Sequence, residues 1–234
     1  MSGSIAVVLA FAQGHAACDT AGVGPWVADD PFAAGRSTVF TDDLGFAAGV
    51  VRVGGRHEVV DYPLTEMLVV HAGELSVVSG EQVVHLKAGG SVVIARGTAF
   101  TLDAGAEALW AWCATRAHAG AKPGLTVLDR HAHLSPSAPP GDDILISQAP
   151  QCRAQGAFEE GALRIGVWDS TAYERRSRGH LCHELMHLTE GQVTLRLDQG
   201  RELVVNPGDT VFVAKGARCG WLSQGYVRKF YAVV

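Results

Sequence analysis

A histidine and a carboxylate at even spacing are the residues of this chain best placed to act together. Arg178, His180 and Glu184 stand at positions i, i+2 and i+6, and side chains at even offsets along an extended strand share one face. The imidazole and the carboxylate would either bind a metal ion or form a hydrogen-bonded polar pair. Arg178 would pair with the carboxylate of a ligand or stay a solvated arginine at the rim. The spacing leaves these alternatives open.

Two further histidines lie close by in the sequence but at odd offsets from that pair. His183 and His187 share a face with each other and point away from His180 and Glu184. We interpret them as interface or surface residues.

Composition and motifs exclude several classes of function. The chain has 234 residues, of which 47% are hydrophobic and 18% are charged, so it is a folded protein. Its net charge of −5 argues against nucleic acid or an anionic membrane as a partner. No apolar run reaches the roughly 18–20 residues that cross a bilayer. The sequence contains no nucleophile elbow, P-loop or dinucleotide fingerprint.

The cysteines and the N-terminal residues indicate the compartment. The five cysteines form no C-x-x-C pair and leave one over, which fits reduced thiols better than a disulfide framework. No Lys or Arg precedes Arg36, so the positively charged start of a secretory signal is missing. We therefore expect a cytoplasmic protein.

The chain repeats itself, which fixes its architecture. In each copy a glutamate precedes a glycine by seven residues, Glu66 before Gly73 and Glu184 before Gly191. The matched stretches are 46–53 with 162–169, 66–78 with 184–197, and 87–98 with 206–217. Such a series of matches indicates a duplicated domain.

The sequence of each copy predicts a set of short strands. The segments are rich in β-branched residues and separated by Gly, Asp or Asn turns, with no sustained helical period. About eight strands at this spacing predict a jelly roll or small closed barrel. We predict an all-β chain with domains at 1–119 and 120–234, in which the barrels occupy roughly 36–116 and 146–234.

These motifs resemble a known family. The pattern E-x6-G, a P-G-D turn and then A/P-x-G is similar to the two motifs of the cupin superfamily. The stretches GVWDSTAYE, HELMHLTEGQVTL, PGDTVFVAKGARCGW and YVRKFYAVV resemble the cupin subfamily that includes (S)-ureidoglycine aminohydrolase. The first copy shows the Tyr-Pro-x-x-Glu of that subfamily at Tyr62, Pro63 and Glu66. The resemblance implies two tandem cupin barrels, also called double-stranded β-helices.

The resemblance also implies where a metal would bind. The four cupin ligand positions fall on Arg178, His180, Glu184 and Cys219. Arginine cannot coordinate a cation, so the implied ligands are His180, Glu184 and Cys219. In the aminohydrolases this site binds manganese through Glu, His, His and Gln, and this chain agrees only at His180. A thiolate ligand favours zinc, iron or nickel over manganese.

The first copy has lost most of that site. The corresponding positions are Val60, Tyr62, Glu66 and Phe100. One carboxylate cannot hold a metal, so this half is either a scaffold or a metal-free pocket that uses Tyr62 and Glu66. In the second copy Trp168 and Trp221 would wall the pocket or simply fill the core.

Two functions follow from these alternatives. The first is a metal-dependent hydrolase that releases ammonia from a small nitrogen-rich or carboxylated metabolite, as the resemblance implies. The second is a metal-free, non-catalytic bicupin that binds a metabolite or supports assembly. We also expect a homodimer, because cupin sheets usually bury an outer face against a neighbour. The outward positions are predicted to include Met67, Val69, Leu185 and His187.

Overall fold

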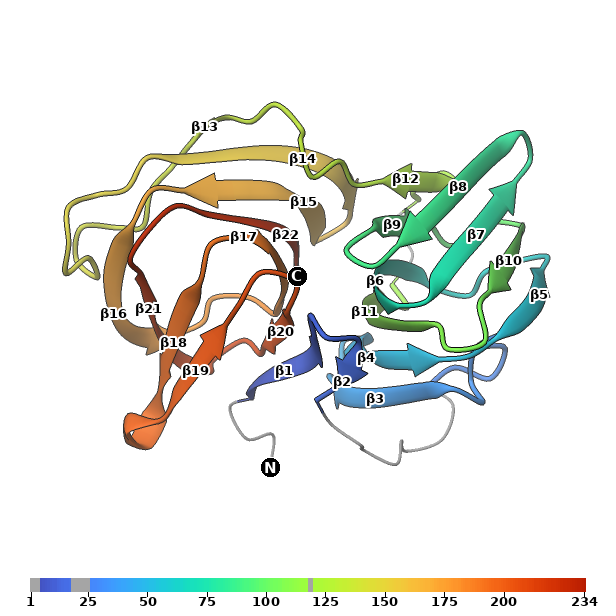
Figure 1. Ribbon diagram of the computed structural model, residues 1–234, viewed down its shortest axis with the longest axis horizontal. Coiled ribbons are helices and arrows are strands. Elements are labelled where there is room, and N and C mark those ends of the chain that lie inside the picture. Colours follow the sequence, from blue (N-terminus) through green and yellow to red (C-terminus); the bar gives the residue numbers. More distant parts are fainter. Residues whose placement is uncertain (1–4, 18–25, 118–119) are drawn as a thin grey trace. The chain divides into compact units, whose positions relative to one another are not determined.

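The computed structural model describes residues 5–17, 26–117 and 120–234, and it is almost wholly β-structure (Figure 1). The chain forms two compact units. The N-terminal unit comprises 9–128 and 158–163, and the C-terminal unit comprises 1–8, 129–157 and 164–234. Within the described residues no helix is long and apolar enough to span a membrane.

The N-terminal unit contains two antiparallel sheets. The first has the order β12-β9-β6-β11-β4-β3, and the second β5-β10-β7-β8. Their bounds are β3 Arg36–Thr41, β4 Phe46–Arg52, β5 Gly55–Val59, β6 Thr65–Ala72, β7 Glu74–Ser79, β8 Gln82–Lys87, β9 Ser91–Ile94, β10 Phe100–Ala104, β11 Leu109–Thr115 and β12 Leu125–Val127. The short strand β2 (His15–Ala16) pairs with the end of β1 (Ala6–Phe11).

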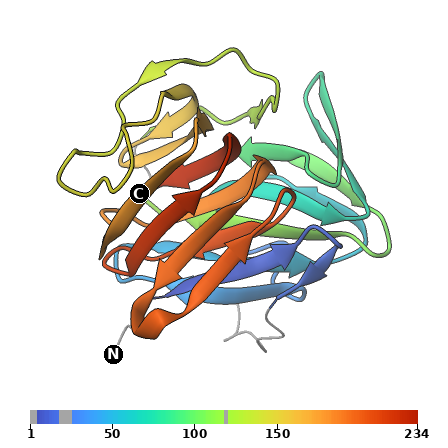
Figure 2. The same cartoon turned by 60° about the vertical axis from the view of Figure 1, so that its left-hand side comes forward.

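The C-terminal unit contains the equivalent sheets. One follows the order β13-β14-β15-β22-β17-β20, with the start of β1 beyond β20, and the other β16-β21-β18-β19. Their bounds are β13 Ser135–Ser137, β14 Cys152–Glu160, β15 Leu163–Ser170, β16 Tyr173–Gly179, β17 Glu184–Glu190, β18 Val193–Leu197, β19 Glu202–Val205, β20 Thr210–Val213, β21 Arg218–Ser223 and β22 Val227–Val233. Figure 2 shows the β18–β19 hairpin in orange, with the short 3-10 turn η1 (Asp198–Gly200) at its tip.

The strand orders confirm the internal repeat and the all-β prediction. Strands β3, β4, β11, β6 and β9 take the same places as β14, β15, β22, β17 and β20, and β5-β10-β7-β8 matches β16-β21-β18-β19. The repeated stretches 66–78 and 184–197 therefore lie on equivalent strands. In each unit the two sheets enclose one apolar core, which contains Trp110 in the first and Trp221 in the second.

A glycine at the same place in each copy allows close strand contact. A Cβ on Gly49 of β4 would lie 2.0 Å from the Ser37 carbonyl oxygen on β3, and one on Gly166 of β15 would lie 2.2 Å from the Gln155 carbonyl oxygen on β14. Real Cβ atoms do not approach backbone oxygens so closely, so both positions require glycine.

The surface on which the homodimer prediction relied is absent. The four residues predicted to face outward are each at most 1% exposed in the single chain, namely Met67, Val69, Leu185 and His187. Alternation within a strand indicates two faces but does not show which of them is exposed. The dimer therefore stays a prediction without that support.

Candidate functional site

His180 and Glu184 form a contact in the C-terminal unit, but they are not on one strand. His180 follows the end of β16, residues 181–183 form a turn, and Glu184 begins β17. The His180 Nε2 atom lies 2.8 Å from Glu184 Oε2, and both side chains are slightly exposed to solvent, at 13% and 12%. The turn, rather than strand alternation, brings the pair together.

A lysine that the sequence analysis overlooked occupies the other carboxylate oxygen. The Lys229 Nζ atom on β22 lies 2.7 Å from Glu184 Oε1. The same ammonium lies 4.9 Å from the ring centroid of Trp168 and 5.3 Å from that of Trp221. A cation over aromatic faces is stabilised by the ring quadrupoles. Glu184 thus already has a cation from its own chain.

These contacts change the acidity of Glu184. Burial acts to raise the pKa of the carboxyl, but Lys229 and the hydrogen bond from His180 outweigh it and hold the pKa well below its usual 4.5. The carboxylate is therefore ionised throughout the neutral range.

Cys219 has the surroundings of a core residue. It is 1% exposed, and its Sγ atom lies 3.2 Å from the Gly220 carbonyl oxygen, to which the thiol donates. Burial is the main cause that raises the pKa of this thiol to about 11, so in the protein without metal the sulfur is protonated at neutral pH.

The arrangement does not fit a bound divalent metal. Across the described parts of the chain, no three His, Cys, Asp or Glu side chains are grouped so that they could hold an ion. Glu184 uses one oxygen for His180 and the other for Lys229. An added cation would have to displace an ammonium already in place.

Aromatic and cationic side chains complete the interior. Tyr173 stacks on Trp221 with ring centroids 5.5 Å apart, and Trp168 meets Trp221 edge to face at 6.1 Å. Arg175 of β16 is buried and donates from Nη1 to the Cys219 carbonyl oxygen at 2.9 Å. Trp221 thus belongs to the core and Trp168 packs against it, and both rings lie near Lys229, while their role as pocket walls stays a prediction.

The N-terminal unit contains a related cluster that is closed to solvent. Tyr62 donates from its hydroxyl to Glu66 Oε2 at 2.9 Å, and Arg36 Nη1 lies 2.8 Å from the same oxygen. Arg36 Nε also lies 2.5 Å from Asp30 Oδ2, and its guanidinium carbon lies 4.1 Å from the ring centroid of Trp112. The side chains of the ion pairs are at most 1% exposed.

The two clusters have the same arrangement of residues. Glu66 and Glu184 are equivalent in the repeat, and each pairs with a cation of its own chain that lies over a tryptophan ring. Burial raises the pKa of Glu66 despite the opposing effect of Arg36. Solvent reaches the cluster around Glu184 but not the one around Glu66, so the C-terminal unit holds the candidate site.

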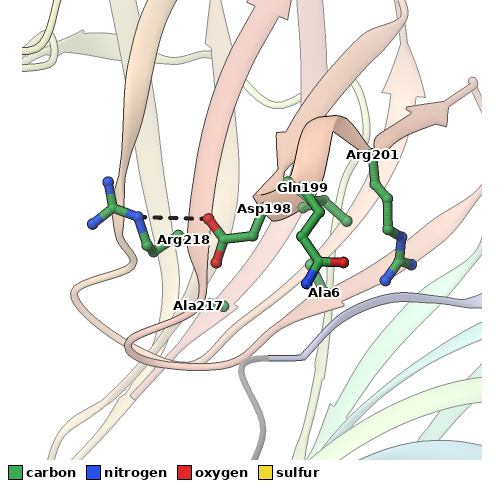
Figure 3. Close-up of a pocket in the computed structure, with 7 residues that line it drawn as sticks. Ala6, Asp198, Gln199, Arg201, Ala217 and Arg218 are labelled. Carbon is green, nitrogen blue, oxygen red and sulfur yellow. Dashed lines mark ion pairs between the residues drawn. The ribbon is translucent and has the colours of Figure 1, made fainter.

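A hollow in the same unit is lined by residues other than those of this site. Figure 3 shows Asp198 and Gln199 of η1 together with Arg218, whose Nε lies 3.6 Å from Asp198 Oδ1. The hollow has a volume of about 170 Å³. Ala217 also lines it and accepts a backbone hydrogen bond from the His180 N–H at 2.9 Å. The hollow thus lies next to the turn that carries His180.

Comparison with known proteins places the chain in a family. A model of the EutQ-like cupin domain matches residues 158–231. A crystal structure from Pseudomonas syringae pv. tomato str. DC3000, of a protein of unknown function in the DUF861 family, is 52% identical to this chain. The match covers 99% of this chain and 100% of that one, with a TM-score of 0.95. The chain belongs to the DUF861 family.

The likeness of this DUF861 protein to more distant structures shows the fold alone. Ylba from E. coli, also a DUF861 protein, has a TM-score of 0.53 at 14% identity over 85% of this chain and 81% of its own. A salicylate 1,2-dioxygenase from Pseudaminobacter salicylatoxidans has a TM-score of 0.52 at 11% identity over 81% and 71%. No curated protein matches the chain. Because one fold hosts unrelated functions, function has to be argued from the site.

The site predicts a dependence of stability on acid. The pKa of Glu184 is lowered on folding, so its contribution to stability is complete above about 4.5 and is lost as the pH falls below that value. We expect Glu184→Gln to lower the urea midpoint at pH 7 and the deficit relative to wild type to shrink toward pH 3. A deficit that stays constant between pH 7 and pH 3 would contradict this assignment.

Proposed function

We propose that this DUF861 protein is a metal-free cupin that binds a small metabolite in its C-terminal unit. The observation that carries the proposal is the position of Lys229, whose ammonium lies against Glu184 where a cupin metal would need that carboxylate. Arg36 takes the same role beside Glu66 in the other copy. A cation of the chain in both copies favours a design that works without a metal.

The residues around Lys229 suit a binding site. Trp168 and Trp221 offer large rigid faces, and Arg178 offers a guanidinium that makes no hydrogen bond or ion pair within the described chain. Pockets for small ligands typically combine such apolar walls with a few polar groups. The release of ammonia that the resemblance implies stays a prediction, and no contact of this site favours it over binding alone.

Metal analysis tests the proposal most directly. Protein purified without added metal, and then dialysed against manganese or zinc, is expected to contain a substoichiometric amount by plasma emission. Stoichiometric metal that is lost in both His180→Ala and Glu184→Gln would overturn the proposal.

A paired substitution tests the role of the lysine. Lys229→Met is expected to abolish the stabilisation of the protein by ligands found in a metabolite screen by thermal shift. The control is Lys215→Met, because Lys215 lies on an exposed turn and bonds to His183 through its backbone N–H, while its side chain makes no hydrogen bond or ion pair within the described residues. If the ligands raise the melting temperatures of the two variants equally, Lys229 is not part of the binding site.

A further inference from the structure

Three cationic side chains lie on the inner face of the C-terminal barrel around Glu184. Lys229 and Arg175 are buried there, and Arg178 is half-buried. The carboxylate among them is Glu184, which already pairs with Lys229. The positive charges of the two arginines therefore determine the charge that a ligand of this site would have to balance.

Arg175 faces the barrel interior. It is two residues from Tyr173, a member of the apolar core, so both side chains lie on the same face of β16. Its cross-strand partner is Trp221, also in the core. Residues directly opposite each other on paired strands share a face.

Arg178 would point away from Arg175 on a regular strand because their offset is three. The pairing of β16 with β21 shifts register between Arg175 and Arg178, and Arg178 then lies opposite Cys219. Cys219 is buried in the core, so the bulge returns Arg178 to the inner face. The bulge in β16 thus directs the Arg178 guanidinium toward the site.

Neither arginine has a counter-ion within the described residues. The Arg175 guanidinium donates to the Cys219 carbonyl oxygen, and no carboxylate lies within ion-pair distance of Arg175 or of Arg178. Arg175 also forms a hydrogen bond with the Tyr173 side chain, but this group is neutral, and a buried charge without a counter-ion is costly.

Three cations against one carboxylate leave an excess of two positive charges. We propose that the ligand of the C-terminal unit is a small dicarboxylate, with one carboxylate bound by Arg175 and the other by Arg178 at the mouth. This inference rests on the proposed metal-free binding function and names its ligand class. Planar guanidinium groups match carboxylates through two parallel hydrogen bonds, and the tryptophan rings would cover the hydrocarbon between them.

Calorimetric titration at low ionic strength tests the ligand class. The probes are oxalate, malonate, succinate and glutarate, with acetate as the single carboxylate and inorganic phosphate as the compact dianion. At least one dicarboxylate is expected to bind about tenfold or more tightly than acetate, since it gains a second charge-assisted contact. Acetate binding as tightly as every dicarboxylate, or binding of phosphate alone, would overturn the inference.

Two variants test the residues. Arg178→Met is expected to weaken the best dicarboxylate about tenfold and to leave acetate binding at Arg175 intact. Arg175→Lys keeps the charge but removes the planar fork, so it should weaken both probes. Arg218→Met is the matched control, because Arg218 is exposed on the adjacent strand and pairs with Asp198. Equal binding by Arg178→Met and Arg218→Met would contradict the assignment.

The outcomes separate this inference from the function on which it rests. Binding of a neutral metabolite in place of every anion would refute the dicarboxylate and leave the metal-free site standing. Stoichiometric metal held through His180 and Glu184 would refute the metal-free site, whichever anion binds.

Discussion

Replacement of Arg36 by methionine is expected to lower the free energy of unfolding at pH 7 by about 3–5 kcal/mol. Arg36 is the cation between two fully buried carboxylates, Asp30 and Glu66. Methionine has a similar volume but leaves both carboxylates buried without a positive charge. Removal of one member of a buried ion pair costs far more than the pair itself contributes, because the remaining charge has lost its solvation.

Urea denaturation at two pH values checks this prediction. Without Arg36 the two carboxylates can avoid the penalty only by protonation, so the loss of stability should be smaller at pH 5 than at pH 7. The control is Arg52→Met, since the Arg52 side chain is 51% exposed and lies 3.8 Å from Glu107, which is 85% exposed. Exposed pairs contribute about 0–1 kcal/mol. Similar losses for the two variants would refute a structural role for the buried cluster.

Gly166→Ala is expected to destabilise the C-terminal unit by about 3 kcal/mol or more. Its Cβ would lie 2.2 Å from the Gln155 carbonyl oxygen and 2.9 Å from the Tyr231 hydroxyl. The first of these is a backbone atom, so the clash can be relieved only by separating β14 from β15. Loss of pairing at this edge would also displace Trp168, which lies two residues further along β15.

Thermal unfolding of Gly156→Ala provides the comparison for Gly166→Ala. Gly156 lies on β14, and a Cβ there would meet nothing within 4 Å. We expect this variant to differ from wild type by at most about 1 kcal/mol. A melting temperature for Gly166→Ala equal to that of Gly156→Ala would show that the strands tolerate the added methyl group.

The two clusters indicate how a duplicated cupin can diverge. In the first copy Arg36 is buried together with Tyr62 and Glu66, and almost no solvent reaches these side chains. Lys229 in the second copy leaves His180 and Glu184 within reach of solvent. One cluster is thus closed to solvent and the other is open to it, although both contain the same central pair of a glutamate and a cation.

The sequence by itself determined the all-β class and the duplication. Repeated glycine and glutamate spacings indicate where strands begin and end and which stretches repeat, because turns and alternation are local properties of the chain. Tyr62 with Glu66 and His180 with Glu184 are separated by four residues, so each pair meets through local geometry. These features need no knowledge of distant strands.

Tertiary structure alone decided which groups surround those pairs. Lys229 reaches Glu184 from β22, which neighbours β17 in the sheet but is far from it in sequence. Arg36 reaches Glu66 from β3, and nothing in the local pattern around either cation distinguishes it from an exposed one. The register shift that turns Arg178 inward is likewise a property of strand pairing. These long charged side chains meet across neighbouring strands, and the sequence does not show which strands are neighbours. The chemistry of the site therefore follows only from the folded structure.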